Sequence, residues 1–486
     1  MRLAPRLLGA AVLLGCAASA AAHVGHGVPR AGRSSAAGVP LDLYERHAAG
    51  SAVRHAKVAR RRRSPAATAP TSEAQEAAIT DETDACTPYS IPEVSALEGT
   101  FPTVWEIADI LPGDVQAQGV WSAIQKSGII PKSVKPKGTP DGDFDSFTPT
   151  YDQSNPDCWW TYEHCDVPKH PGIPDDIVGC PEPSTYGLTF DDGPNCTQQV
   201  LYDYLRDQKQ KATMFYIGSN VMDWPLQAQR GLVDGHDICV HTWSHRYMTS
   251  LNDTQVFAEL YYTAKAIKDV MGITVQCWRP PFGDVDDRVR AIATGLGLAT
   301  IIWTDDTDDW QMKPAGKKSQ KAIDRNYAAI IAGENSQKGN IVLAHELNNG
   351  TMHEFISQYP NIKARFDHVV PVFSCMNNTK PYLEDITYPS FEEYIAGGVA
   401  SGLPGPDIKA VSTTYAPVLA QATSAASQQS AGAAGATKQN STAAGKQSDQ
   451  SAADGQKKSS ASPAYSAFGA AMAVAGCGAV ALMATL

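Results

Sequence analysis

The sequence YGLTFDDGP at residues 186–194 decides the fold. A short run of apolar and β-prone residues that ends in two carboxylates and a Gly-Pro breaker predicts a buried strand followed by a turn. Adjacent side chains in a strand point to opposite faces, so Asp191 and Asp192 reach one pocket only if the turn at Gly193-Pro194 redirects the chain. One carboxylate would then bind a metal while the other stays free as a base. The alternative is an Asx-type turn that caps the next helix.

Four further strands are predicted to end on polar clusters. These clusters are HTWSH at 241–245, RPPFG at 279–283, the acidic residues 305–309, and His345. Helical patterns separate several of the strands and occur at 198–207, 226–234 and 256–271. Strands that alternate with helices predict an α/β fold with a parallel sheet. In a parallel α/β barrel the active site lies at the carboxyl ends of the strands, so we expect the polar clusters to converge on one rim.

The HTWSH segment contains two histidines four residues apart, His241 and His245. On a helix, side chains at i and i+4 share a face and can hold one metal ion. Together with an aspartate they form a two-histidine, one-carboxylate set, which suits Zn, Co or Fe(II) and leaves positions open for water and substrate. Two paired surface histidines are the alternative.

Taken together, the motifs resemble those of a known family. TFDDGP at 189–194, HTWSH, RPPFG, DTDDW at 306–310 and LAH at 343–345 occur in this order. The sequence thereby resembles the polysaccharide deacetylases with a NodB-type domain (carbohydrate esterase family 4), and its ends resemble those of fungal GPI-anchored chitin deacetylases. Phe282 stands where many members have tyrosine. The resemblance implies a distorted (β/α) barrel of the NodB type over residues 183–395.

The family also implies roles for particular residues. It makes Asp192, His241 and His245 the ligands of a divalent metal, Zn²⁺ or Co²⁺. It makes Asp191 the base that takes a proton from the attacking water, with Arg279 holding it by a charge-assisted hydrogen bond. His345, oriented by Asp309, would protonate the departing amine, which is a poor leaving group when unprotonated.

Three further residues are expected at the substrate. The Phe282 backbone N–H would complete an oxyanion hole, and the change from tyrosine leaves this donor in place. Trp310 and Leu343 resemble the walls around the acetyl methyl group, with ordinary core packing as the alternative. The implied reaction is hydrolysis of the N-acetyl groups of β-1,4-linked N-acetylglucosamine in chitin, giving chitosan and acetate. The alternatives are another polymer, such as peptidoglycan or acetylxylan, and a non-catalytic chitin-binding wall protein.

Both ends of the chain read as processing or linker sequence. Residues 1–20 have the charge, apolar run and small-residue cleavage site of a signal peptide. Residues 21–85 are predicted as a low-complexity pro-segment or linker, and 86–182 as an N-terminal extension packed on the catalytic domain. Residues 396–455 are expected to form a flexible stalk. Residues 456–486 match a GPI-attachment propeptide with its anchor within 451–455, at Asp454, and a spanning tail is the rival reading.

The remaining composition favours an extracellular enzyme. The charge of −11, from 40 basic and 51 acidic residues, gives no reason to expect nucleic acid, and we expect a monomer. Eight cysteines outside the two ends predict up to four disulfides in any of 105 pairings. Glycosylation acceptors occur at Asn195, Asn252, Asn349, Asn377 and Asn440. These features predict passage through the secretory pathway to the outer leaflet of the plasma membrane and the cell wall.

Overall fold

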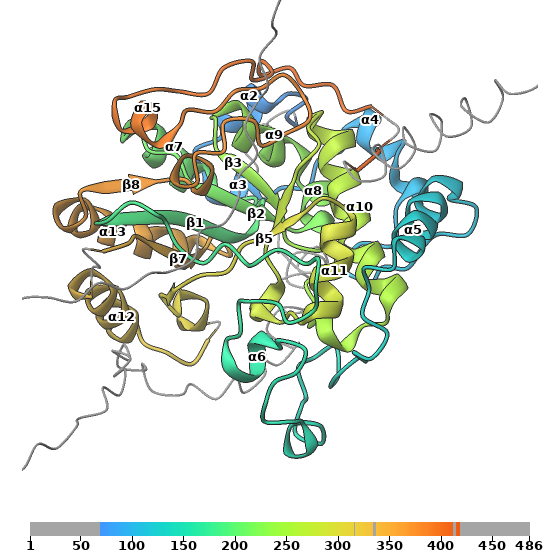
Figure 1. Cartoon of the computed structure of the whole chain (residues 1–486). Coiled ribbons are helices and arrows are strands. Elements are labelled where there is room, and N and C mark those ends of the chain that lie inside the picture. The colour runs from blue at the N-terminus through green and yellow to red at the C-terminus, as the bar shows by residue number, and fades with distance from the viewer. Residues whose placement is uncertain (1–68, 315, 334–336, 412–414, 418–486) are drawn as a thin grey trace, which may run out of the picture. The chain divides into compact units, whose positions relative to one another are not determined.

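The computed structural model describes residues 69–314, 316–333, 337–411 and 415–417. Within these residues eight strands form one sheet (Figure 1). The strands are β1 (Thr185–Gly193), β2 (Thr213–Tyr216), β3 (Asp237–Val240), β4 (Cys277–Trp278), β5 (Ala299–Thr300), β6 (Asp305–Asp306), β7 (Asn340–His345) and β8 (His368–Val370). The sheet order is β5-β4-β3-β2-β1-β7-β6, β8 pairs with β1, and the pairings between these strands are parallel. This curled parallel sheet confirms the predicted distorted (β/α) barrel.

Helices surround the strands (Figure 1). They are α7 (Gln199–Asp207), α8 (Gly218–Asp223), α9 (Pro225–Val233), α10 (Asp253–Met271), α11 (Asp287–Gly295), α12 (Gln320–Ala332), α13 (Asn349–Arg365), α14 (Val372–Cys375) and α15 (Phe391–Ile395). Short 3-10 helices follow the strand ends as η4 (Met248–Ser250), η5 (Pro281–Gly283) and η6 (Asp309–Gln311). The helices predicted at 198–207, 226–234 and 256–271 are therefore α7, α9 and α10.

Strand β1 lies at the centre of the sheet, and all nine of its residues are buried. It pairs with β2, β7 and β8, which accounts for the lack of a polar alternation in its sequence. Helix α10 packs outside the sheet and is buried along most of its length. A capping box at Asn252 and Gln255 starts this helix, and the left-handed Gly272 (φ +83°) ends it.

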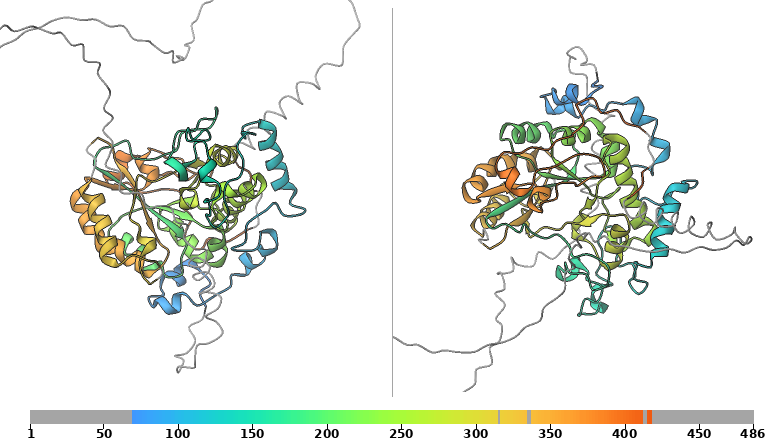
Figure 2. Two further views of the ribbon diagram at one scale, coloured as in Figure 1. Left: turned by 90° about the horizontal axis from the view of Figure 1, so that it is seen from below. Right: turned by 45° about the horizontal axis from the view of Figure 1, so that its top comes forward.

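The N-terminal extension lies outside the helical layer (Figure 2). It contains α2 (Glu73–Ala77), α3 (Glu82–Ala85), α4 (Pro92–Ser95), η2 (Glu98–Thr100), α5 (Val115–Ser127), η3 (Thr148–Thr150) and α6 (Trp160–Glu163). Phe101 stacks on Trp243 with ring centroids 5.7 Å apart, and Trp121 packs on Phe257 at 5.2 Å. These aromatic contacts join the extension and the barrel in one hydrophobic core.

The expected linker and stalk boundaries differ from the structure. Helices α2 and α3 lie within the predicted linker at 21–85, and the Glu76 side chain is buried against Gln199, so this end of the segment is folded. In the first part of the predicted stalk at 396–455, Ala410 and Tyr415 are buried, and Tyr415 packs on Tyr261. The predicted signal, most of the stalk, and the attachment region with Asp454 lie outside the described residues. No helix in the described part is long and apolar enough to cross a membrane.

All eight cysteines that were expected to form disulfides are paired. The disulfides are Cys86–Cys196, Cys158–Cys165, Cys180–Cys375 and Cys239–Cys277. The first joins the extension to the loop after β1, 110 residues later in the chain, and the third spans 195 residues. Closing such long loops restricts the unfolded chain, so the extension is covalently part of the folded unit.

Candidate functional site

The two carboxylates near the end of β1 face the same point because the strand bulges. The pairing with β2 passes from Asp191 directly to Gly193 and skips Asp192, which has a left-handed backbone (φ +75°). Asn220 donates from Nδ2 to the Asp192 carbonyl at 2.9 Å and so fixes the bulge. Asp191 Oδ2 and Asp192 Oδ1 then lie 3.7 and 3.5 Å from His241 Nε2. The redirection expected at Gly193-Pro194 thus begins one residue earlier.

The two histidines do not lie on a helix, and that part of the prediction is wrong. His241 follows β3, and left-handed residues at Thr242 (φ +66°) and His245 (φ +55°) turn the chain instead. The fully buried Glu259 carboxylate accepts the backbone N–H groups of Trp243 and Ser244 at 2.9 and 2.8 Å. Because a side chain from α10 satisfies these donors, the loop needs no helical hydrogen bonds to bring the imidazoles together.

Asp192, His241 and His245 can hold a divalent cation. Each offers one ligand atom, the three atoms lie within 4.8 Å of one another, and all three residues are buried. Asp192 Oδ1 lies 3.1 Å from His245 Nε2 and accepts no hydrogen bond from the described residues. His241 Nδ1 is held by the Arg279 carbonyl at 2.9 Å, which leaves Nε2 for a ligand. A buried carboxylate oxygen that faces only two imidazole nitrogens fits a divalent metal ion with nitrogen and oxygen ligands.

The protonation of this group also suits a metal. Burial lowers the pKa of His245 below its ordinary value although Asp192 opposes the shift, and neutral imidazole is the form that binds metals. Burial by itself raises the pKa of Asp192, but the His245 and His241 imidazoles hold that pKa well below its usual value. Both directions favour the forms that bind a metal ion, the ionised carboxylate and the neutral imidazole.

Arg279 fixes the second carboxylate. Its Nη1 donates to Asp191 Oδ1 at 2.7 Å and to Thr189 Oγ1 at 2.8 Å, and the side chain is fully buried. The guanidinium lies over the Phe215 ring at 4.0 Å. With one carboxylate oxygen engaged by the arginine, Oδ2 remains directed to the histidines. Thr189 belongs to the TFDDGP motif but had no predicted role, and Phe215 was not singled out, because both contacts depend on the neighbouring strands.

His345 and Asp309 form a second charged pair at the same rim. His345 is the pairing partner of Asp191 across β1 and β7, so the register alone brings the two residues together. Asp309 accepts from His345 Nδ1 at 2.6 Å with Oδ1 and from the His345 backbone N–H at 2.9 Å with Oδ2. Burial lowers the pKa of His345, but the Asp309 carboxylate outweighs it and raises this pKa to about 10. The imidazole is thus charged near neutral pH.

The three residues expected at the substrate lie in η5, η6 and β7. Phe282 is half-buried with a left-handed backbone (φ +59°), and its ring contacts the His245 ring at a centroid distance of 4.7 Å. Trp310 is half-buried in η6, directly after Asp309. Leu343 is buried in β7, two residues before His345. Their predicted contacts with an acetyl group remain predictions.

Sequence reasoning missed a buried carboxyl next to the site. Glu346 follows His345 and is fully buried, its backbone N–H donates to the Asp191 carbonyl at 3.0 Å, and a Cβ on Gly193 would overlap its Oε1. Burial, reinforced by the charges of Asp192 and Asp191, raises the pKa of Glu346 well above its usual value. A glutamate after a predicted strand has no special pattern, so Glu346 could not be singled out from the sequence.

Four of the five predicted glycosylation acceptors lie in the described part. Asn252 and Asn377 are exposed. Asn195 donates from Nδ2 to the Leu347 carbonyl at 2.8 Å, and Asn349 donates from Nδ2 to Glu82. A glycan on either of these two nitrogens would displace a hydrogen bond, so the exposed pair is the better suited. Asn440 lies outside the described residues.

Comparison with known proteins identifies the family. A family model described as polysaccharide deacetylase matches residues 179–301. Chitin deacetylase 2 of Cryptococcus neoformans var. grubii is 48% identical over 396 residues, covering 80% of this chain and 81% of the relative. The chain belongs to the polysaccharide deacetylase family.

Within that family it is similar to fungal proteins along most of its length. The chitin deacetylase of Amylomyces rouxii is 45% identical over 316 residues, covering 63% of this chain and 73% of that protein. A solved structure of the chitin deacetylase from Colletotrichum lindemuthianum is 22% identical, with a TM-score of 0.40, and covers 43% of this chain and 96% of that one.

Proposed function

We propose that this protein is a chitin deacetylase, which hydrolyses the N-acetyl groups of β-1,4-linked N-acetylglucosamine in chitin to give chitosan and acetate. The observation that carries the proposal is the convergence of three units on one rim: the Asp192, His241 and His245 group, the Asp191–Arg279 pair and the His345–Asp309 pair. Binding chitin needs neither a base nor an acid, so this set favours an enzyme over a wall-binding protein. The names of the relatives favour chitin over another acetylated polymer.

The residues act in a defined order in this proposal. A divalent metal, Zn²⁺ or Co²⁺, held by Asp192, His241 and His245 would polarise the acetyl carbonyl and lower the pKa of water. Asp191, with Oδ1 fixed by Arg279, takes the proton from the attacking water. The Phe282 backbone N–H stabilises the negative charge that develops on the carbonyl oxygen.

His345 completes the reaction. Its Nδ1 is engaged by Asp309 at 2.6 Å, so Nε2 is the nitrogen that can donate a proton to the departing glucosamine amine. Protonation is required because an unprotonated amine is a poor leaving group. Trp310 and Leu343 are the apolar walls for the acetyl methyl group in this arrangement.

The test is acetate release from purified protein and short chitin oligomers, measured before and after exhaustive chelation and after addition of Zn²⁺ or Co²⁺. We expect chelation to abolish the activity and either metal to restore it. Release of acetate from acetylxylan or peptidoglycan fragments, with none from chitin oligomers, would show that another polymer is the substrate. Full activity after chelation would refute the metal-dependent mechanism.

A variant separates the base from the ligands. Asp191→Asn should retain zinc and lose activity by about 10²–10⁴-fold, the usual cost of losing general-base catalysis. Asp385→Asn is the matched control, since Asp385 is exposed and pairs with Lys380 on the surface. If zinc and activity fall in parallel in Asp191→Asn, Asp191 is a metal ligand rather than the base.

The proposal includes the cellular site. A secreted glycoprotein, monomeric and attached by a GPI anchor within 451–455, would meet chitin at the outer leaflet of the plasma membrane and in the cell wall. Phosphatidylinositol-specific phospholipase C should release such a protein from membranes. Mass spectrometry of the mature chain decides the matter more strictly, because retention of residues 464–486 would establish a spanning tail.

A further inference from the structure

The turn that carries Phe282 is built from outside the barrel. We call residues 280–287 the Phe282 turn, and residues 157–170, closed by the Cys158–Cys165 disulfide, the cystine loop. The turn lies between Arg279 and helix α11 and contains two consecutive left-handed residues, Phe282 (φ +59°) and Gly283 (φ +70°). Such a backbone persists only where its surroundings enforce it, and here much of that surrounding structure comes from the N-terminal extension.

The two segments are joined through their backbones. Trp160 N–H donates to the Val285 carbonyl at 2.9 Å, and Asp287 N–H donates to the Asp157 carbonyl at 2.8 Å. The buried Lys137 ammonium bridges the same two segments, with Nζ 2.6 Å from Asp157 Oδ2 and 2.5 Å from an oxygen of Asp286. These contacts fix the turn beyond Phe282.

Asp284 connects the cystine loop to the loop that carries His245. Its Oδ1 accepts from Trp159 Nε1 at 2.9 Å and from Thr161 Oγ1 at 2.6 Å. Its Oδ2 accepts from the backbone N–H and the hydroxyl of Thr249, both at 2.8 Å. Asp284 is fully buried, so the loss of either set of donors would leave a buried carboxylate poorly satisfied.

Within the cystine loop, Trp160 packs against Gly283, the residue that follows Phe282. A Cβ placed on Gly283 would overlap the Trp160 ring, so the ring lies directly against the turn. On its other side Trp160 meets Trp303 edge-to-face at a centroid distance of 5.0 Å. The Phe282 ring in turn stacks on Tyr247 at 4.1 Å and contacts His245. Phe282 is therefore held between the cystine loop and the histidine loop.

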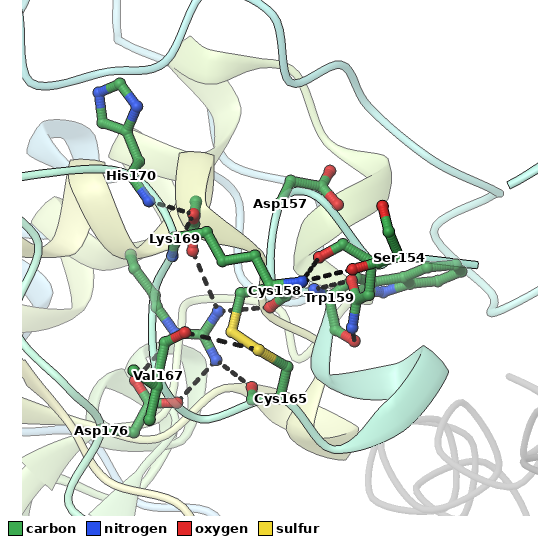
Figure 3. Close-up of a disulfide and its surroundings, with 12 residues drawn as sticks. Ser154, Asp157, Cys158, Trp159, Cys165, Val167, Lys169, His170 and Asp176 are labelled. Atoms are coloured by element: carbon green, nitrogen blue, oxygen red, sulfur yellow. Dashed lines mark hydrogen bonds and ion pairs between the residues drawn. A yellow bond between two sulfur atoms is a disulfide. The ribbon is translucent and has the colours of Figure 1, made fainter. Parts of the chain in front are cut away.

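Arg290 of α11 binds both ends of the cystine loop, whose disulfide is shown in Figure 3. The fully buried Arg290 donates to the carbonyl of Cys158 at 2.7 Å and to that of Cys165 at 2.8 Å. The same guanidinium binds both oxygens of Asp176 at 2.8 and 2.7 Å. Because one guanidinium donates to both carbonyls, it holds the two ends of the closed loop on α11. Trp159 and Trp160 lie between these two ends and contact the turn.

We propose that the cystine loop is the positioning element of the Phe282 turn, with Trp160 as the positioning residue that fixes Phe282 for the reaction. The inference rests on the proposed function, which assigns the Phe282 backbone N–H to the carbonyl oxygen of the substrate. Displacing that donor weakens stabilisation of the developing charge while the metal ligands stay in place. The extension, for which the sequence offered no role, is then part of the catalytic apparatus.

The test compares Trp160→Ala with Trp160→Phe in the full folded chain. Removing one oxyanion donor typically costs about 10²–10³-fold in kcat, so we expect Trp160→Ala to lose about 10²-fold in kcat at unchanged zinc content. Trp160→Phe should recover most of it, because a phenyl ring still packs on Gly283. Trp121→Ala is the control, since Trp121 is a buried tryptophan of the same extension that packs on Phe257, away from the turn. It should lower the melting temperature and leave kcat unchanged.

Hydrogen exchange of the peptide 279–287 gives a readout that does not depend on activity. Exchange should be faster in Trp160→Ala and in the double variant Cys158→Ser/Cys165→Ser, and unchanged in Trp121→Ala. If the wild type is active, two results would overturn the inference. One is unchanged exchange of this peptide in Trp160→Ala and the double variant, and the other is a loss of kcat in Trp160→Ala that is explained by its smaller folded fraction. The wild-type protein could release no acetate while the variants still exchange faster than it does. This result would refute the proposed function but support the structural role of the loop.

Discussion

Replacing Asp309 with asparagine tests the assignment of the general acid. In the structure Asp309 Oδ2 accepts the His345 backbone N–H at 2.9 Å, and Oδ1 accepts from Nδ1 at 2.6 Å. Asparagine keeps the shape but has only one oxygen. That oxygen must face the backbone donor, which turns the amide N–H₂ to the imidazole. Nδ1 then has to accept a hydrogen bond, so the imidazole of His345 becomes neutral.

The size of the effect follows from this change of charge. The Asp309 carboxylate raises the pKa of His345 to about 10 against the opposing effect of burial. Without the carboxylate, burial remains, and the imidazolium is no longer the stable form at neutral pH. Loss of a general acid typically costs about 10²–10⁴-fold, so we expect kcat for N-acetyl oligomers to fall within this range at unchanged zinc content.

The assay compares an amide substrate with an acetyl ester on the same sample. An alcohol leaves more readily than an amine, so the ester rate should fall much less. Activity that needs the imidazolium persists at low pH and is lost as the pH rises through the pKa of His345. In the variant this loss of activity should occur at lower pH. Asp308→Asn is the control, because Asp308 pairs with Lys318. Equal losses on amide and ester, or loss of zinc, would refute the assignment.

Three further changes test other parts of the structure. Gly193→Ala should destabilise the protein by about 1–3 kcal/mol, because the new methyl group overlaps the buried Glu346 carboxyl. Thermal unfolding measures this loss, with Gly99→Ala as the control because a Cβ on Gly99 meets no atom within 4 Å. Burial raises the pKa of Asp237 to about 8. As the pH rises, the unfolded chain therefore loses the Asp237 proton at a lower pH than the folded protein does. The free energy of unfolding should fall between about pH 4 and about pH 8, by up to about 1.4 kcal/mol per pH unit. Asp237→Asn should flatten that slope in denaturant titrations at several pH values. Arg279→Lys loses the planar guanidinium that fixes Asp191 and should cost about 10²-fold in kcat with zinc retained; a change in zinc content alone would contradict it.

The sequence predicts the ends of the strands well because local chemistry determines them. An apolar run followed by DDGP must leave the sheet at Gly193-Pro194, and the structure places this departure within one residue. The parallel arrangement then brings His345 beside Asp191 through the strand register alone. The rim on which the motifs meet could therefore be predicted without coordinates.

What the sequence does not reveal depends on residues far apart in the chain. The histidine loop is shaped by Glu259, a buried carboxylate on α10 whose helical surroundings give no sign of that role. The disulfide pairing follows from packing, so the eight cysteines left 105 possibilities open. The extension packs on the barrel because Phe101 and Trp121 find aromatic partners there, and those partners lie more than 100 residues later in the chain.

The backbone at the site explains why motif residues can be recognised while their geometry cannot. Asp192, Thr242, His245, Phe282 and Asp308 all have left-handed φ values between +55° and +75°. Each such residue costs about 1–3 kcal/mol, and local propensity would predict none of them. The described structure holds these positions with buried contacts from elsewhere: an amide from α8, a carboxylate from α10 and the ring of Trp160. Reactive side chains are therefore aimed by strained turns whose stability is supplied by distant parts of the chain, and mutations in those distant parts should affect the reaction rate before they affect the fold.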